Sequence, residues 1–250
     1  MRYLRIPNLP EADVGLLAVS AAYPGIRMEL EKQGIKVISV GSSALLPEPV
    51  QAHADMLCHP LGGRRVVVAK REKKLLVNLK QFGFQTRESA SVIAGSYPND
   101  SPLNAARVGN RLIANPRVLD KTIRDDCFSN HIKIVEVRQG YAKCSVAVVD
   151  EHSIITSDHG IAVAASKEGI EVLKIQPGYI RLPGYSYGFI GGSCGLIGRN
   201  RMAFAGNPNC HPDFYKIKEF LDRRKIEIIA LSKDSLLDIG GMILLMEQEV

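Results

Sequence analysis

The chain of 250 residues contains no tryptophan, and aromatic residues make up only 6% of it. So few rings leave few platforms on which the bases of a single-stranded nucleic acid could stack. No apolar run reaches the roughly 20 residues that a membrane span requires. The first fifteen residues, "MRYLRIPNLPEADVG", lack the basic and then apolar layout of a signal peptide. These absences predict a cytoplasmic protein.

Cysteine is also scarce, with five residues at positions 58, 127, 144, 194 and 210 and no C-x-x-C pair. An odd and scattered set argues against a disulfide framework and for reduced thiols. The hydrophobic content of 46% and the charged content of 23% are typical of a globular chain with a large core. The formal net charge is 32 − 26 = +6, with basic clusters at 64–65, 70–74, 199–201 and 222–225. Such clusters fit either RNA phosphates or an ordinary solvated surface.

One phrase recurs along the chain: "GIKVISV", "HIKIVEV", "GIEVLKI" and "KIEIIAL", with "GFQTRES" as a weaker copy. Each copy alternates apolar and polar residues, which is the period of a half-buried strand. Copies start near 34, 83, 131, 169 and 225, so the spacings are 49, 48, 38 and 56. Before two of them, "PGIRMELEKQG" and "DFYKIKEFLDRRK" carry the punctuation or apolar face of a helix. Periods of this length indicate a radial or solenoid array.

Each repeat continues with a loop and a strand hairpin, most clearly in "CSVAVVDEHSIITS" and "CGLIGRNRMAFAG". "LCHPLGGRRVVVA" and "AARVGNRLIAN" fit the same frame. The last copy has too little chain for its third strand and helix, and the N-terminal "GLLAVSAAYPGIRMELEKQG" supplies such a pair. We therefore expect residues 1–250 to form a single α/β domain, a five-bladed β/α-propeller with pseudo-fivefold repeats, closed by the N-terminal segment.

This arrangement resembles the pentein superfamily of β/α-propellers. "GIEVLKIQPGYIRLPGYSYGFIGGSCGLIGRNRMAFAGN" looks like one pentein blade, and the similarity of blade pattern extends over most of the chain. The superfamily includes arginine deiminases, dimethylarginine hydrolases, amidinotransferases and a non-enzymatic ribosome anti-association factor. The sequence looks most similar to an uncharacterised bacterial branch of this fold. The resemblance implies a central axial pocket.

The resemblance also implies a late-blade cysteine nucleophile, a histidine in the preceding blade and carboxylates that hold a guanidinium. Here the last middle strand, "LLDIGGMILL", carries Met242 where that cysteine is expected, and Ile190 or Gly191 stands near the histidine position. Asp55 alone fits a carboxylate position. The usual amidino-transfer machinery is therefore absent by residue identity, and whether the chain is an enzyme stays open.

In a radial array, the residues at the entrance of each middle strand converge on the axis. These positions predict a set of ligand-binding residues: Asp55, Asn104, Ser145, Ser193, Cys194 and Asp238, together with Lys143 and Cys144. Such a polar funnel is suited to an amino or guanidino ligand held by charge-assisted hydrogen bonds. The alternative is a wet channel that holds only water.

Cys144 and Lys143 are the candidate catalytic residues, because a nearby cation favours a thiolate. Successive side chains of a strand point to opposite faces, so this pairing requires a turn or bulge at 140–142. Cys144 as a small packed residue is the alternative, and Cys194 is a second candidate thiol. "GGSCG" matches G-x-S-x-G, but a nucleophile elbow needs a helix directly afterwards, whereas a strand hairpin follows.

We expect no metal and no other cofactor. His53, Asp55, Cys58 and His59 in "HADMLCH", and the pair Cys210-His211, lack the paired spacing of zinc ligands. The sequence therefore predicts a protein that binds a small polar ligand, with a Cys-dependent hydrolase or transferase reaction as one version of it. The alternative is a non-catalytic protein- or RNA-binding module that resembles the ribosome anti-association factors. The oligomeric state is not predicted.

Overall fold

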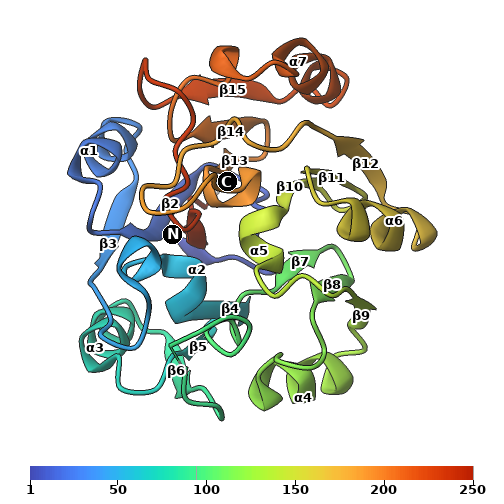
Figure 1. The fold of residues 1–250 in the computed structure, drawn as a ribbon. Helices are drawn as coiled ribbons and strands as arrows, with labels where there is room; N and C mark the ends of the chain where they lie inside the picture. The colour runs from blue at the N-terminus through green and yellow to red at the C-terminus, as the bar shows by residue number, and fades with distance from the viewer. Residues whose placement is uncertain (94, 250) are drawn as a thin grey trace.

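Five small β-sheets are arranged around the centre of the molecule, with helices on their outer sides (Figure 1). The computed structural model describes residues 1–93 and 95–249. Four of the sheets have three strands and the fifth has four. The sheets are separate from one another in their backbone hydrogen bonds, so side chains must fill the space between them.

The elements follow one another as the sequence predicts, with strands and helices in regular alternation. The strands are β1 (Arg2–Tyr3), β2 (Val14–Ser20), β3 (Lys36–Val40), β4 (Cys58–Gly62), β5 (Arg65–Val68), β6 (Gln85–Glu88), β7 (Ala106–Val108), β8 (Arg111–Ala114), β9 (Lys133–Glu136), β10 (Ala147–Asp150), β11 (Ser153–Thr156), β12 (Glu171–Lys174), β13 (Cys194–Gly198), β14 (Arg201–Phe204), β15 (Glu227–Ala230) and β16 (Ile243–Glu247). The helices are α1 (Pro24–Lys32), α2 (Ala54–Leu57), α3 (Lys73–Gln81), α4 (Lys121–Ser129), α5 (Ala142–Ser145), α6 (His159–Lys167) and α7 (Phe214–Asp222). Three 3₁₀ turns complete the set: η1 (Glu48–Val50), η2 (Ile190–Gly192) and η3 (Pro208–Cys210).

One connection is repeated in every sheet: an antiparallel pair, then a helix, then a strand parallel to the second. In one sheet, β10 pairs antiparallel with β11, and β12 pairs parallel with β11 after α6. A parallel neighbour needs a crossover connection, and the nine-residue helices α1, α3, α4, α6 and α7 supply it. The four hairpins and the two helices predicted from sequence are confirmed.

The five recurring phrases begin two residues before β3, β6, β9, β12 and β15. Each of these strands pairs parallel with the second strand of the preceding hairpin, for example β15 with β14. The structure therefore groups each phrase with the hairpin and helix before it, whereas the sequence repeat places it at the start of a unit. The crossover helix is the physical reason, because it returns the chain to the sheet it has just left.

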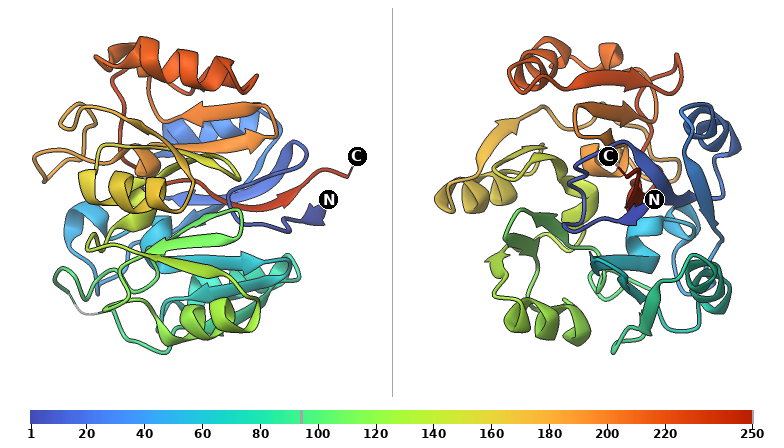
Figure 2. Two further views of the ribbon diagram at one scale, coloured as in Figure 1. Left: turned by 90° about the vertical axis from the view of Figure 1, so that its right-hand side faces the viewer. Right: turned by 180° about the vertical axis from the view of Figure 1, so that it is seen from behind.

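The two ends of the chain share one sheet. β16 pairs antiparallel with both β2 and β1, in the order β1-β16-β2-β3, and both termini leave on the same side of the molecule (Figure 2). The buried carboxylate of Glu247 accepts hydrogen bonds from Arg2 Nε at 2.8 Å and from the backbone N–H groups of Glu11 and Ala12 at 2.6 and 3.0 Å. These bonds hold the N-terminal segment against the last strand.

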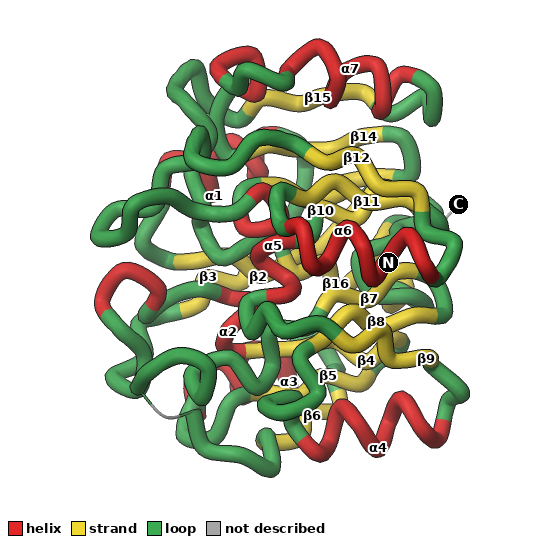
Figure 3. Tube along the Cα trace, turned by 45° about the vertical axis from the view of Figure 1, so that its right-hand side comes forward, coloured by secondary structure: helices red, strands yellow, loops and turns green. Residues whose placement is uncertain are grey.

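The core lies between neighbouring sheets, and β2 shows how. All seven residues of β2 are buried. Leu16 and Ala18 belong to one apolar cluster, and Leu17 and Val19 belong to another, because alternate side chains of a strand point to opposite faces. Strands therefore occupy the interior and the longer helices the periphery, as the tube in Figure 3 shows.

Single helical turns, rather than strands, stand at the entrances of three inner strands. α2 leads into β4, α5 leads into β10 and η2 leads into β13, and all three lie near the centre of Figure 1.

Within residues 1–93 and 95–249, no helix has both the length and the apolar character for a membrane crossing.

Replacement of Glu247 by alanine tests the closure between the chain ends. Glu247→Ala leaves two N–H groups without their acceptor, so we expect the free energy of unfolding in urea to fall by about 2–3 kcal/mol. Glu249→Ala is the matched control, because Glu249 is exposed and its carboxylate forms an ion pair with the terminal amine. This control should lose less than about 0.5 kcal/mol. Equal losses in the two variants would contradict the closure role.

Candidate functional site

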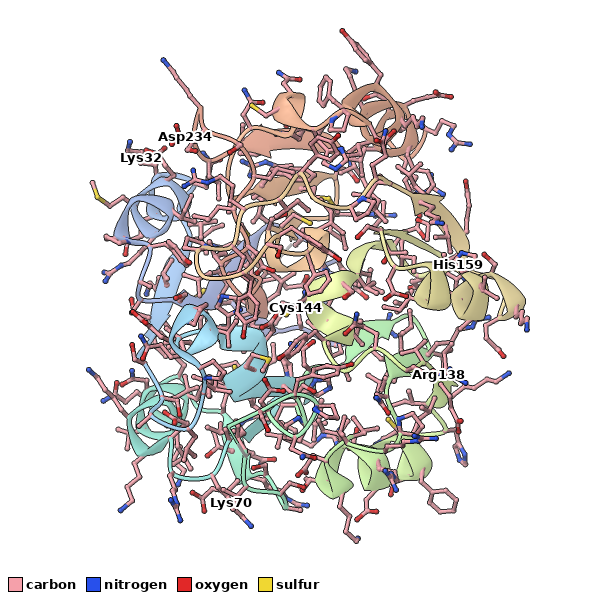
Figure 4. The ribbon with its side chains drawn as sticks, in the orientation of Figure 1. Lys32, Lys70, Arg138, Cys144, His159 and Asp234 are labelled. Carbon is pink, nitrogen blue, oxygen red and sulfur yellow. The ribbon has the colours of Figure 1, made fainter. Side chains whose placement is uncertain are left out.

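Cys144 lies near the centre of the molecule (Figure 4), and its thiol is held by side chains from α2 and from the loop before β7. Its Sγ donates to Asp55 Oδ2 at 2.9 Å and accepts from Asn104 Nδ2 at 3.1 Å. Asn104 Oδ1 accepts from the backbone N–H groups of Lys143 and Cys144, at 2.7 and 3.2 Å. Asn104 therefore binds both the start of α5 and the thiol that α5 carries.

The surroundings of this thiol favour its protonated form. Burial, the negative charges of Asp55 and Asp238 and the hydrogen bond to Asp55 raise the pKa of Cys144 well above its ordinary value, and the bond from Asn104 opposes them only in part. Burial also raises the pKa of Asp238, with His53 acting against it. In the unliganded protein, Cys144 is therefore a neutral hydrogen-bond donor.

The side chain of Lys143 contacts other groups than the side chain of Cys144 does. Its Nζ is buried and donates to the carbonyl oxygen of Gly191 at 3.3 Å. Lys143 and Asp55 line a small cavity of about 10 Å³, and Cys144 lines a larger one. The structure places both residues on a helical turn, which is the turn that the pairing of Lys143 and Cys144 requires. Because the pKa of the thiol is nevertheless raised, the geometry does not support activation by Lys143.

The larger cavity has a volume of about 250 Å³, and we call it the axial cavity. His53, Cys144 and Asp238 contribute its polar side chains together with Ser186. Its apolar and aromatic wall consists of Val50, Met56, Tyr141, Leu182, Tyr185, Tyr187 and Phe189. The sequence predicts a polar funnel here, but the aromatic wall makes the site a largely apolar pocket with a few polar groups. This composition is typical of small-molecule sites.

Asp238 is fixed in this cavity by backbone donors. Its two carboxylate oxygens accept from Phe189 N at 2.9 Å and from Gly240 N at 3.0 Å. A Cβ on Gly192 would lie 2.0 Å from Asp238 Oδ1, so only glycine fits beside the carboxylate. In "GGSCG", Gly192 therefore serves close packing against Asp238, whereas Gly191 packs against the carbonyl oxygens of Lys143 and Val146. The segment continues into β13 rather than into a helix.

The remaining predicted site residues lie near the centre but bond within the protein. Ser193 Oγ and Cys194 Sγ both donate to the carbonyl oxygen of Ile190, at 2.9 and 3.2 Å. Burial raises the pKa of Cys194 to about 12. Ser145 is fully buried, and its Oγ has no hydrogen-bond partner among the described residues. The role of these three residues in ligand binding stays a prediction.

The residues of "HADMLCH" separate in the structure. Cys58 Sγ donates to Ala54 O at 3.4 Å, and His59 Nδ1 lies 3.1 Å from Leu103 O. Burial raises the pKa of Cys58 to about 12 and lowers that of His59 to about 4. His53 and Asp55 meet Cys144 instead, with donor atoms of all three residues within 4.8 Å of one another. In the pair Cys210-His211, whose spacing is also unlike that of zinc ligands, Cys210 is exposed and His211 Nδ1 accepts from Asp213 N.

Sequence reasoning considered His53 only as a metal ligand and did not place it at the cavity, and it missed the aromatic wall. His53 lies two residues before Asp55, and its Nδ1 is 3.9 Å from Asp238 Oδ1. Tyr185, Tyr187 and Phe189 come from one segment, "GYSYGF". Three rings within five residues, in a chain with 6% aromatic residues, are the signal that could have identified this wall.

Several of the basic clusters are engaged in ion pairs. Arg224 contacts Asp150 and Glu171, Arg223 contacts Glu171, and Arg201 lies 3.6 Å from Asp13. In the cluster at 64–65, Arg65 pairs with Asp126. These partners offset the charge of Arg65, Arg201, Arg223 and Arg224, which would otherwise attract phosphates.

Solved structures with the same chain path are similar to this protein over nearly its whole length. An amidinotransferase of the saxitoxin biosynthetic pathway from Microseira wollei is 11% identical, with 98% of each chain covered and a TM-score of 0.59. Inosamine-phosphate amidinotransferase from Streptomyces griseus is 10% identical, with 99% of this chain and 98% of that chain covered and a TM-score of 0.60. DDAH from Pseudomonas aeruginosa, complexed with citrulline, is 7% identical, with 92% and 96% covered and a TM-score of 0.57.

The fold is therefore the α/β fold of the pentein superfamily, as the resemblance in the sequence predicts. A family model described as a family of unknown function, DUF6873, matches residues 18–243, and the chain belongs to this family. No curated protein sequence matches the chain. At identities of 7 to 11%, the solved structures establish the fold alone.

Alkylation kinetics test the state of the Cys144 thiol. Because its pKa is raised, we expect its alkylation rate to keep rising about tenfold per pH unit at and above pH 9, without a plateau. Asp55→Asn removes one negative charge and one acceptor, so alkylation of Cys144 at pH 8 should become faster by roughly tenfold or more. Mass spectrometry of the labelled peptides gives the rate, with the exposed Cys210 as internal reference. A plateau of the wild-type rate below pH 8 would contradict the assignment.

Proposed function

We propose that the axial cavity binds a small cationic molecule with an amino or guanidino group. The observation that carries this proposal is the composition of the cavity, in which the buried carboxylate of Asp238 lies beside aromatic rings. A carboxylate attracts a cation through charge-assisted hydrogen bonds, and aromatic faces add a cation–π attraction. A volume of about 250 Å³ suits a group of amino-acid size.

The buried charges support a cationic ligand. Asp55 and Asp238 are buried carboxyls, and Lys143 is the buried cation near them. A bound cation would stabilise the ionised form of Asp238 and so lower its raised pKa. The wall residues Tyr141, Tyr187 and Phe189 form a run of tilted and edge-on rings, with centroids 6.4 and 6.1 Å apart, that can enclose such a group.

The reaction that fits this geometry is attack by Cys144 on an electrophilic carbon of the ligand. In this step the bond from Sγ to the carbon forms, and the thiol proton passes to Asp55 Oδ2, which already accepts a hydrogen bond from it at 2.9 Å. The bond from the carbon to the leaving amine then breaks as that amine takes up the proton from Asp55. Water or a second amine next attacks the carbon and gives up a proton to Sγ as the bond from Sγ to carbon breaks, which restores the thiol and releases the product, as in a hydrolase or a transferase. A cationic ligand would also offset the two carboxylates that raise the pKa of the thiol.

The similar solved structures add support of a general kind. They include amidinotransferases and an agmatine deiminase from C. jejuni, whose names refer to the amidino group and to a guanidino compound. We also propose that the five sheets are the blades of a pseudo-fivefold β/α-propeller, so that the axial cavity lies at the pole of the ring. The ion-paired basic clusters give no comparable support to an RNA-binding module.

Thermal-shift measurements with guanidino compounds and their uncharged ureido analogues test this proposal. The guanidino compounds should bind at least about tenfold more tightly than ureido compounds of the same shape, because only they pair with Asp238. Asp238→Asn should remove most of this preference. Asp234→Asn is the matched control, because Asp234 is an exposed carboxylate of the same loop on the periphery of Figure 4.

Cys144→Ser separates binding from chemistry. Binding should persist in this variant, whereas release of amine from a ligand that the wild type converts should fall by more than about 1,000-fold. Equal binding of charged and uncharged ligands by the wild type, or the same loss in both aspartate variants, would refute the cation site.

A further inference from the structure

Three chemically different metal-binding side chains meet beneath the axial cavity. One donor atom each from His53, Asp55 and Cys144 lies within 4.8 Å of the other two. The three side chains come from the start of α2 and from α5, and the residues are 2%, 1% and 3% exposed. The sequence does not bring them together, because 91 residues separate His53 from Cys144. The fold alone creates this cluster.

Several polar atoms of the cluster have no partner. Among the described residues, neither ring nitrogen of His53 has a hydrogen-bond partner, and Asp55 Oδ1 has none. Buried polar atoms are nearly always hydrogen-bonded, because leaving them unpaired costs the full desolvation penalty. The two ring nitrogens of His53 and Asp55 Oδ1 are such atoms, and they lie close to the thiol of Cys144. Together they point to an occupant that accepts electron pairs.

We propose that His53, Asp55 and Cys144 bind a zinc ion at the floor of the axial cavity. An imidazole nitrogen, a carboxylate oxygen and a thiolate sulfur are all zinc ligands. With bond lengths of about 2.0–2.3 Å, the donor atoms of a tetrahedral site lie roughly 3.3–3.7 Å apart. The present separations, from 2.9 Å between Cys144 Sγ and Asp55 Oδ2 up to 4.8 Å, lie on either side of this range. Small side-chain movements are enough to reach it.

When zinc binds, the three side chains replace water molecules on the ion, and atoms and charges balance in this exchange. The Cys144 thiol loses its proton to solvent, the bond from Sγ to zinc forms, and a zinc-bound water leaves for each protein ligand that enters. The thiolate and the Asp55 carboxylate together match the charge of the ion. Asp238 Oδ1, 3.9 Å from His53 Nδ1, stands where a carboxylate can orient a metal-bound imidazole.

The fourth position of this site faces the axial cavity, since His53 and Cys144 line that cavity. Three protein ligands and one open position are typical of catalytic rather than structural zinc. The inference goes beyond the proposed function, because a zinc-bound Cys144 is a ligand and no longer a free nucleophile. Binding of the ion requires no organic ligand, so the failure of either proposal can be recognised without the other.

Titration with Co²⁺ tests the site directly. The full chain carrying Cys210→Ser, which removes the exposed thiol, is freed of metal with a chelator and titrated with Co²⁺. We expect one Co²⁺ per chain, with a thiolate-to-cobalt charge-transfer band that Zn²⁺ abolishes by displacement. Cys144→Ser should remove the band, and His53→Ala should weaken binding by more than about 100-fold. Cys194→Ser, which alters a buried thiol bonded to Ile190 O, should leave both unchanged.

A second measurement needs no variant of the cluster and decides the matter if one fails to fold. Zn²⁺ should slow the modification of Cys144 by a small thiol reagent in the wild-type chain, and leave the rate at Cys210 unchanged. Modification is followed by mass spectrometry until Cys144 of the metal-free chain is half modified. An undiminished band in folded Cys144→Ser, no Co²⁺ binding by the wild type, or a Cys144 rate unaffected by Zn²⁺ would overturn the proposal.

Discussion

The hydrogen bonds of Asn104 tie together three of the five sheets and fix the geometry on which the site depends. Its side chain leads from the loop before β7 to the thiol of Cys144 and to the backbone of α5, while the same thiol donates to Asp55 on α2. Lys143 continues the connection to Gly191, and backbone groups around Gly192 hold Asp238. Polar bonds therefore cross between sheets that share no backbone hydrogen bonds. Because all these groups are buried, each bond contributes to the alignment of the sheets as well as to the site.

The fold determines where the groups of the site lie, but it does not by itself give the thiol the protonation state of a nucleophile. The fold brings a thiol, an imidazole and two carboxyls together, but burial and the two carboxyls keep the thiol protonated. Lys143 donates to the carbonyl oxygen of Gly191 and not to the thiol, so a further positive charge that enters the cavity would favour the thiolate. The reactivity of the Cys144 thiol therefore depends on the charge of the molecule bound beside it as well as on the protein.

The sequence repeat predicts the order of strands and helices, because strand period and helix punctuation are local properties. The strands that follow positions 34, 83, 131, 169 and 225 are present, and the residues at the inner strand entrances include Asp55, Asn104 and Cys144, which do meet. The faces of Lys143 and Cys144 were not predictable, since four residues of helix precede β10 and replace the alternation of a strand. The aromatic wall comes from a loop, whose path depends on tertiary contacts rather than on periodicity.

Charge determines which occupants the buried centre can hold at one time. With Asp55 and Asp238 ionised and Lys143 protonated, the centre carries one negative charge, which a single guanidinium or ammonium group neutralises. With zinc bound and Cys144 as thiolate, three negative charges oppose the lysine and the divalent ion, and the sum is again zero. Both occupants together would leave a buried positive charge, which is costly in a medium of low dielectric constant. The cation site and the metal site therefore depend on the same buried charges, so occupation of either one weakens the other.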